Sequence, residues 1–295
     1  SAVLIKMTVE LQVQEKADNN IISIEIDKGL ISLRALSSKR TRFEIEYALE
    51  KGSTANSFLF LTNGSPNSKD YPPIIIHPPG AAFGSLFIQE LKKFLKDTNQ
   101  EIYIVVGHIN PNRIKLLRSL VSIYANTTLI CSTPGAKLIQ DIWNQKNPTK
   151  VNDISKIPEV EMPKIQAIKT KITIPISNNY QLTLIPAPTA RWPGALLAFE
   201  ETLGLLMSDK YFGAHICTKD WAEANPSVTE EERRHYFDCL MAPMTSQIDG
   251  IIERLEELDI RTIAPGHGPA IEASWRSLLN DYLRWGEGKQ QNLLK

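Results

Sequence analysis

The sequence predicts an α/β fold in which two sheets face each other and helices cover their outer faces, an αββα sandwich in a single domain. Three observations support this prediction. Residues 1–62 hold short alternating or β-branched runs typical of strands, strand and helix patterns alternate over residues 74–145, and a similar succession returns after residue 163. Strands followed by flanking helices, twice over, are typical of two layered halves that pack sheet against sheet.

The first half is expected to begin as a meander of strands. Runs rich in β-branched residues predict strands at 4–13, 21–26, 30–35, 42–49, 57–62 and 74–76. A stretch rich in Asn, Gly, Ser and Pro at 63–70 predicts a loop. Helical periodicity then alternates with apolar runs, which predicts a helix at 86–95, a strand at 101–106, a helix at 113–124, a strand at 128–131 and a helix at 136–145.

The second half is expected to repeat this theme. Apolar runs predict strands at 165–174, 181–185 and 203–207, and the last of them leads to Asp209. Ser227 precedes Glu230 by three residues, which is the capping-box spacing of a helix start. Residues 1–275 form the predicted core, and residues 276–295 form a closing helix and tail. The proline-containing stretch 144–163 is interpreted as the connection between the halves, because a domain boundary there would divide the candidate site described below.

Composition excludes several classes of protein. The 33 basic and 33 acidic side chains cancel, so no charge excess indicates nucleic-acid binding. No run approaches the roughly 20 apolar residues that cross a bilayer, and residues 1–7 lack the order of a signal peptide. The three cysteines are widely spaced without a CxxC motif, which favours buried thiols in a reducing compartment. We expect a cytoplasmic protein without membrane insertion.

The segment 107–113 has the position of a metal-binding loop. The β-branched run 101–106 predicts a buried strand, and the periodic run from 114 predicts a helix. Side chains between a strand end and a helix start lie at the edge of a sheet, where α/β folds commonly place their chemistry. Of the polar residues in this loop, only His108 is a common metal ligand.

This loop, together with residues 47–59 and 192–194, resembles the metallo-β-lactamase superfamily, and specifically its flavodiiron branch of the cyanobacterial multi-domain type. The resemblance covers nearly the whole chain. The family carries the pattern His-x-Glu-x-Asp-His, followed by a distant His, Asp and His. The matching residues are His108, Asn110, Asn112, Arg113, Arg191, Asp209 and His267. Three ligand positions are therefore kept, at His108, Asp209 and His267, and four are substituted.

The resemblance implies two iron ions held by four histidines and three carboxylates. The formal charge of the matched side chains is −1 + 2 = +1 here, against −3 in the family pattern. A divalent iron about 4 Å from one arginine would experience about 8 kcal/mol of repulsion at an effective dielectric of about 20. We therefore predict that the retained positions are empty, that this core has no catalytic residues or cofactor of its own, and that Arg113 and Arg191 pair with Asp209, with leftover positive charge for a small anion.

The resemblance also implies a function for a longer protein. Its relatives pass electrons from NAD(P)H through flavin to O2, giving water, as a photoprotective outlet. The FMN lies in a flavodoxin-like domain that follows the core, and a flavin reductase domain comes after it; no phosphate-binding loop is visible after Leu294. Relatives assemble head to tail, so this core is expected to be inactive alone and to act in a homo- or hetero-oligomer with an intact paralogue.

Two other classes remain open from the residues. One is a non-catalytic scaffold or regulatory subunit. The other is a residual mononuclear metal enzyme that uses His108, Asp209, His267 and a water. The hydrolase pattern His-x-His-x-Asp-His fails at positions 110, 112 and 113. His77 is interpreted as a loop histidine bonded to backbone, and His235 as part of a solvated helix face.

Overall fold

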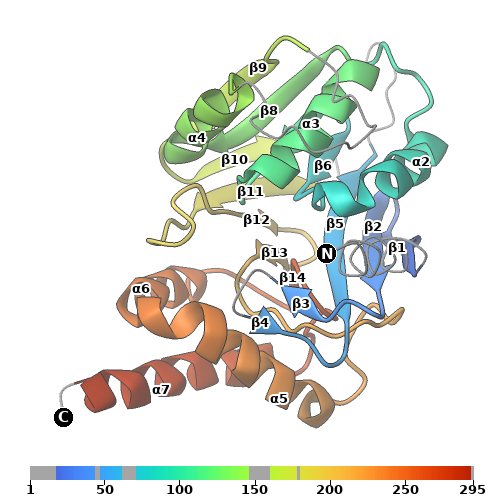
Figure 1. The fold of residues 1–295 in the computed structure, drawn as a ribbon. Coiled ribbons are helices and arrows are strands. Elements are labelled where there is room, and N and C mark those ends of the chain that lie inside the picture. Colours follow the sequence, from blue (N-terminus) through green and yellow to red (C-terminus); the bar gives the residue numbers. More distant parts are fainter. Residues whose placement is uncertain (1–17, 44–46, 62–70, 146–159, 178–179, 294–295) are drawn as a thin grey trace, which may run out of the picture.

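Two facing sheets with helices on both outer sides make up the fold, as Figure 1 shows. The computed structural model describes residues 18–43, 47–61, 71–145, 160–177 and 180–293. The predicted strand at 4–13 and the predicted loop at 63–70 lie outside these ranges. The αββα arrangement predicted from the sequence is confirmed.

The first sheet has seven strands in the order β1-β2-β5-β6-β7-β8-β9. Its first four strands pair antiparallel and the rest parallel. The strands are β1 (Asn19–Asp27), β2 (Leu30–Ser37), β5 (Ser53–Phe60), β6 (Ile74–Ile76), β7 (Ile102–Val105), β8 (Thr127–Ser132) and β9 (Lys164–Ile168). The outer face is covered by η1 (Ala81–Phe83), α2 (Gly84–Phe94), α3 (Pro111–Ile123) and α4 (Thr133–Trp143).

The second sheet has five strands in the order β10-β11-β12-β13-β14, of which only β13 and β14 pair parallel. They are β10 (Ile172–Pro175), β11 (Gln181–Pro186), β12 (Leu196–Glu200), β13 (Leu205–Asp209) and β14 (Thr262–Pro265). A short hairpin joins β3 (Arg42–Phe43) to β4 (Tyr47–Ala48). The outer face carries α5 (Pro226–Tyr236), η2 (Phe237–Met241), η3 (Ala242–Met244), α6 (Thr245–Leu255) and α7 (Trp275–Leu293).

Three apolar layers hold the sandwich together, one between the sheets and one under each set of helices. Strand β13 shows how the sequence supplies two of them. Leu205 and Met207 belong to the layer between the sheets, whereas Leu206 belongs to the layer under α5–α7. Side chains alternate across a strand, so a continuous apolar run is what a strand buried on both faces requires. No helix in the described part of the chain is long and apolar enough to span a bilayer.

Several predicted elements need correction. The strand predicted at 165–174 is two strands in different sheets, β9 and β10, because the polar residues 169–171 between them are exposed and form the crossing. Within the strand predicted at 42–49, the described residues form two short antiparallel strands, β3 and β4. Helix α5 begins earlier than predicted, since Asn225 is its N-cap and accepts a hydrogen bond from the Ser227 amide. Strands β12 and β14 and helix α6 were not predicted.

Candidate functional site

The candidate site is a cavity at one edge of the sandwich, where strands from both sheets end. In the first sheet, His77 follows β6 and His108 follows β7, and these two strands pair parallel. In the second sheet, Asp209 ends β13 and His267 follows β14, which also pair parallel. The carboxyl ends of these strands therefore bring four polar side chains together. The cavity has a volume of about 220 Å³, and its polar lining consists of Arg40, Asn56, His77, His108, Asn110, Asn112, Arg113, Asp209, Lys210 and His267.

The backbone at this edge is unusual at two of these residues. His77 and Asp209 have φ angles of 54° and 48°, in the left-handed region that non-glycine residues rarely adopt. Asp209 is held there by a hydrogen bond of 2.6 Å from the Gly266 amide to its carbonyl. A Cβ at Gly266 would lie 2.5 Å from that carbonyl oxygen, so only glycine permits this approach. The strain is thus concentrated where the site is built.

The loop that carries His108 is closed by Asn110. The Asn110 Oδ1 accepts a hydrogen bond of 2.8 Å from the Arg113 amide and caps α3. Its Nδ2 lies 3.0 Å from His108 Nε2 and donates to that ring nitrogen, which assigns the proton of the neutral ring to Nδ1. The Asn110 amide therefore already occupies the lone pair of His108 Nε2. Asn110 caps α3 and bonds the His108 ring, which is a different role from that of a carboxylate that binds a metal.

His267 meets a lysine that the sequence patterns did not single out. Its Nδ1 lies 3.2 Å from the Thr54 carbonyl oxygen and donates to it, so Nε2 presents its lone pair to the cavity. Lys210 Nζ lies 3.5 Å from that Nε2, and the lysine is only 3% exposed. The ammonium group therefore faces the ring atom that a metal would bind. An internal cation occupies the side of His267 where the family pattern implies iron.

Arg113 is buried in the cavity wall without a direct carboxylate partner. Its Nε and Nη1 are buried and make no hydrogen bond, and the same holds for Oδ2 of Asp209. The Oδ2 atom of Asp209 lies 3.9 Å from Nδ1 of His77. Burial lowers the pKa of Arg113, and the charge of Asp209 opposes that shift. The predicted direct pairing of Arg113 with Asp209 is therefore wrong, although the two groups still interact electrostatically.

Arg191 lies apart from the other matched residues. It is not among the residues that line the cavity, and its guanidinium carbon lies 5.9 Å from the ring centre of Trp192. Its charge still reaches the site, since it contributes to the lowered pKa of His108. The structure thus brings together six of the seven matched positions and leaves Arg191 outside.

The histidines of the site are neutral at pH 7. Burial lowers the pKa of His108 and His267 well below the ordinary value; the next cause is the charge of Lys210 for His108, and His215 followed by Lys210 for His267. The pKa of His77 is also lowered, chiefly by burial. His77 lines the cavity, and a hydrogen bond with the Met207 backbone is among the interactions that oppose the lowering of its pKa. Among the described residues, the lining carries three cationic side chains, Arg40, Arg113 and Lys210, and one carboxylate, that of Asp209.

His215 is a further residue that sequence reasoning missed. It is fully buried, its ring centre lies 4.6 Å from that of His267, and its Nδ1 lies 2.8 Å from Ser53 Oγ. No spacing in the sequence places His215 near the matched residues, because it reaches them through an irregular segment after β13. Its ring packs against the ring of His267.

The donor set does not fit a diiron centre. Iron in such centres needs several anionic carboxylates, whereas the described part of the cavity lining supplies one carboxylate and three positively charged side chains. Among the residues that the structure describes, no group of three or more His, Cys, Asp or Glu is arranged to hold a metal ion. His108 and His267 also direct their Nε2 atoms at Asn110 and Lys210 respectively. We therefore derive no chemical step through iron in this core.

The two facing sheets, the outer helices and a polar site at the strand ends define a metallo-β-lactamase-like core. The model of the ODP family of β-lactamases matches residues 54–268, and this chain belongs to that family. Diflavin flavoprotein A 4 of Nostoc sp. is 34% identical over 91% of this chain and 43% of the relative. Diflavin flavoprotein A 3 of Synechocystis sp. is 32% identical over 94% of this chain and 42% of the relative. The chain thus spans less than half the length of these relatives.

Solved structures agree with this assignment. The metal-soaked Flv1 flavodiiron core from Synechocystis sp. superposes with a TM-score of 0.78 at 31% identity, covering 91% of this chain and 61% of that one. A fragment of diflavin flavoprotein A 5 from Nostoc sp. gives a TM-score of 0.79 at 29% identity, covering 93% of this chain and 99% of the fragment. The resemblance to flavodiiron proteins stated from the sequence is confirmed for the core module.

Proposed function

We propose that this chain is the core module of a flavodiiron-type oxidoreductase, cytoplasmic in its location, whose full-length form passes electrons from NAD(P)H through flavin to O2. The product is water, and the role is a photoprotective outlet. The FMN belongs to a flavodoxin-like domain of the longer protein. Support comes from relatives named diflavin flavoproteins that align over nine-tenths of this chain and less than half of their own length.

Within that system the core works without metal. The observation that carries this proposal is the replacement of anionic ligands by internal partners: Asn110 on His108, and the Lys210 ammonium on His267. Both replacements satisfy ring nitrogens that would otherwise be open to a metal. A three-ligand site of His108, Asp209 and His267 would have to displace both partners, which disfavours the residual mononuclear enzyme.

The positive lining suits a small anion. Arg113 carries two buried nitrogens without hydrogen bonds, and Lys210 and Arg40 line the same cavity. A guanidinium bound to an oxyanion or halide would satisfy donors that are otherwise costly to bury.

Elemental analysis of protein from iron-supplemented cells tests the metal-free state. We expect iron and zinc near zero in the unmodified chain. A variant with Asn110→Glu, Asn112→Asp, Arg113→His and Arg191→His restores the ligand pattern, and adding Lys210→Ala clears Nε2 of His267. Iron should appear in the five-residue variant and less in the four-residue one. About two irons per unmodified chain would overturn the proposal.

An activity measurement tests the role in the longer protein. The full-length protein should consume O2 with NADPH only slowly by itself and should stimulate an intact paralogue with which it forms a head-to-tail hetero-oligomer. A variant paralogue without its own flavin would separate the two roles, because only an electron-donating partner restores its activity. No restoration, with binding retained, would favour a scaffold or regulatory subunit.

A further inference from the structure

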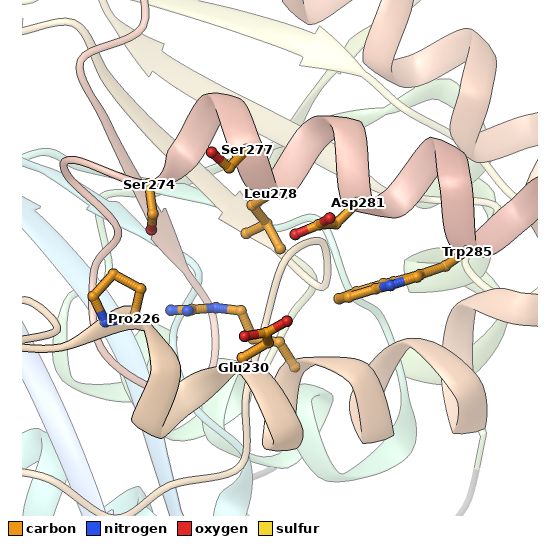
Figure 2. A pocket seen from close by; sticks show the side chains of 8 residues that line it. Pro226, Glu230, Ser274, Ser277, Leu278, Asp281 and Trp285 are labelled. Carbon is orange, nitrogen blue, oxygen red and sulfur yellow. The ribbon is translucent and has the colours of Figure 1, made fainter.

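A second pocket lies between α5 and α7, on the outer side of the second sheet and away from the charged cavity. Its volume is about 210 Å³. In Figure 2, Glu230 on α5 lies opposite Leu278 and Asp281 on α7, with Trp285 at one end of the pocket. The helices therefore present acidic and apolar side chains to the same space.

Arg233 lines this pocket with a fork of unused donors. Its side chain is 4% exposed, and its Nη1 is bonded to Glu223 Oε2 and to Thr229 Oγ1. Its Nε and Nη2 are buried and have no hydrogen-bond partner. These two nitrogens form one edge of the guanidinium plane, the edge that binds the two oxygens of a carboxylate side by side. Burying such donors unbonded is unfavourable, so a ligand that accepts from them is stabilised.

The remaining charges of the pocket select what can bind there. Glu223 is already occupied, since its oxygens accept from Arg233, Thr229 and Ser274. Glu230 and Asp281 add two carboxylates to the lining, and Asp281 pairs with Arg284 at 2.7 Å. Negative groups at the rim disfavour a ligand that is only anionic and favour one that also carries a positive group.

We propose that this pocket binds a free α-amino acid with an apolar side chain. The carboxylate of the ligand receives the Nε and Nη2 donors of Arg233, and its ammonium group faces Glu230 and Asp281. Its side chain packs against Leu278 and Trp285, which supply the apolar part of the lining. The site is independent of the electron-transfer role proposed above and adds a small-molecule input to this face of the core.

Isothermal titration calorimetry with three matched probes tests the proposal. L-leucine carries both charges, 4-methylpentanoate only the carboxylate and 3-methylbutylamine only the ammonium. We expect L-leucine to bind at least about tenfold more tightly than either single-charge probe, which corresponds to about 1.4 kcal/mol. Equal affinity for 4-methylpentanoate, or no binding of L-leucine at millimolar concentration, would overturn the proposal.

Variants assign the binding to this pocket. Arg233→Lys keeps the charge but removes the fork, and should weaken L-leucine binding at least about tenfold. Should that buried substitution prevent folding, Glu230→Gln serves instead, because Glu230 is exposed. It should weaken L-leucine while leaving 4-methylpentanoate unchanged or tighter. Glu231→Gln, at an exposed neighbour outside the pocket lining, is the matched control and should bind as the unmodified chain does. A loss of affinity in this control equal to that in Glu230→Gln would contradict the assignment.

Discussion

Two buried arginines, Arg34 and Arg113, occupy opposite kinds of environment. Arg34 donates from Nη1 to Asn56 Oδ1 and from Nη2 to the Thr218 carbonyl, which leaves its Nε without a hydrogen bond, whereas both Nε and Nη1 of Arg113 make none. Burial lowers the pKa of Arg34 to about 10, yet its bonds tie together segments distant in sequence. For Arg113, the charge of Asp209 opposes the lowering of the pKa by burial. A buried arginine with several hydrogen bonds stabilises the fold, whereas one with few hydrogen bonds indicates a position where a ligand can bind.

The hydrogen bonds around Arg34 also fix the geometry of the candidate site. Asn56, which accepts from Arg34, donates from Nδ2 to the carbonyl oxygens of Pro265 and Gly268, each at 2.7 Å. These carbonyls flank His267, so Asn56 fixes the turn that presents this histidine. The cavity depends on Arg34 and Asn56 for its geometry, while Arg113 contributes charge.

The largest effect should follow Asn56→Ala. The change leaves a buried guanidinium donor and two carbonyl groups without partners, and each such loss costs about 1–3 kcal/mol. We expect about 3 kcal/mol of destabilisation in urea unfolding at pH 7.5. A cost below about 1 kcal/mol would contradict the scaffold role assigned to the Arg34 region.

Acid should lower the free energy of unfolding through the buried histidines around the cavity. Burial lowers the pKa of His215, as it does for His108 and His267, so the folded chain stays unprotonated while the unfolded chain binds protons below a pH of about 6.5. Stability is therefore full above that pH and is lost as the pH falls, by about 1.4 kcal/mol per pH unit for each histidine. The charged and titratable groups that act on His215 or contact it are Arg40, Lys210, His235, Tyr236 and His267.

Replacing His215 measures how much this histidine contributes to the pH dependence of the unfolding free energy. In His215→Gln the dependence of the unfolding free energy on pH between about 6 and 5 should become shallower by about 1.4 kcal/mol per unit. His235→Gln is the matched control, since His235 is an exposed histidine, and it should leave the slope unchanged. Equal slopes in all three proteins would show that His215 takes no part in the acid sensitivity.

Arg113→Met should change stability by less than about 1 kcal/mol, because the lost charge is poorly compensated and the new side chain is apolar. Its second consequence sharpens the comparison with Arg34. Sulfate at matched ionic strength should raise the thermal midpoint of the unmodified chain and leave that of Arg113→Met unaffected. A cost comparable to that of Asn56→Ala would place both arginines in the scaffold.

The sequence was enough to predict the layered fold, because long β-branched runs and helical periodicities follow from burial alone. The resemblance to flavodiiron proteins placed His108, Asn110, Asn112, Arg113, Asp209 and His267 around one site, and these residues line the cavity. The role of Lys210 could not be predicted. The left-handed backbone at Asp209 breaks the strand alternation, so consecutive residues Asp209 and Lys210 both line the cavity. Side-chain direction at a strained strand end depends on tertiary contacts.

A comparison within the loop separates two neighbouring asparagines at matched ligand positions. Asn110→Ala removes the N-cap of α3 and the donor to His108, and should cost about 1 kcal/mol. Asn112→Ala removes an exposed side chain and should stay within about 0.5 kcal/mol. Urea unfolding of both variants decides whether the substitutions in this loop are equivalent. A similar cost at both positions would mean that Asn112 is also structural, whereas the expected difference shows that Asn110 was recruited to the scaffold while Asn112 merely faces the cavity mouth.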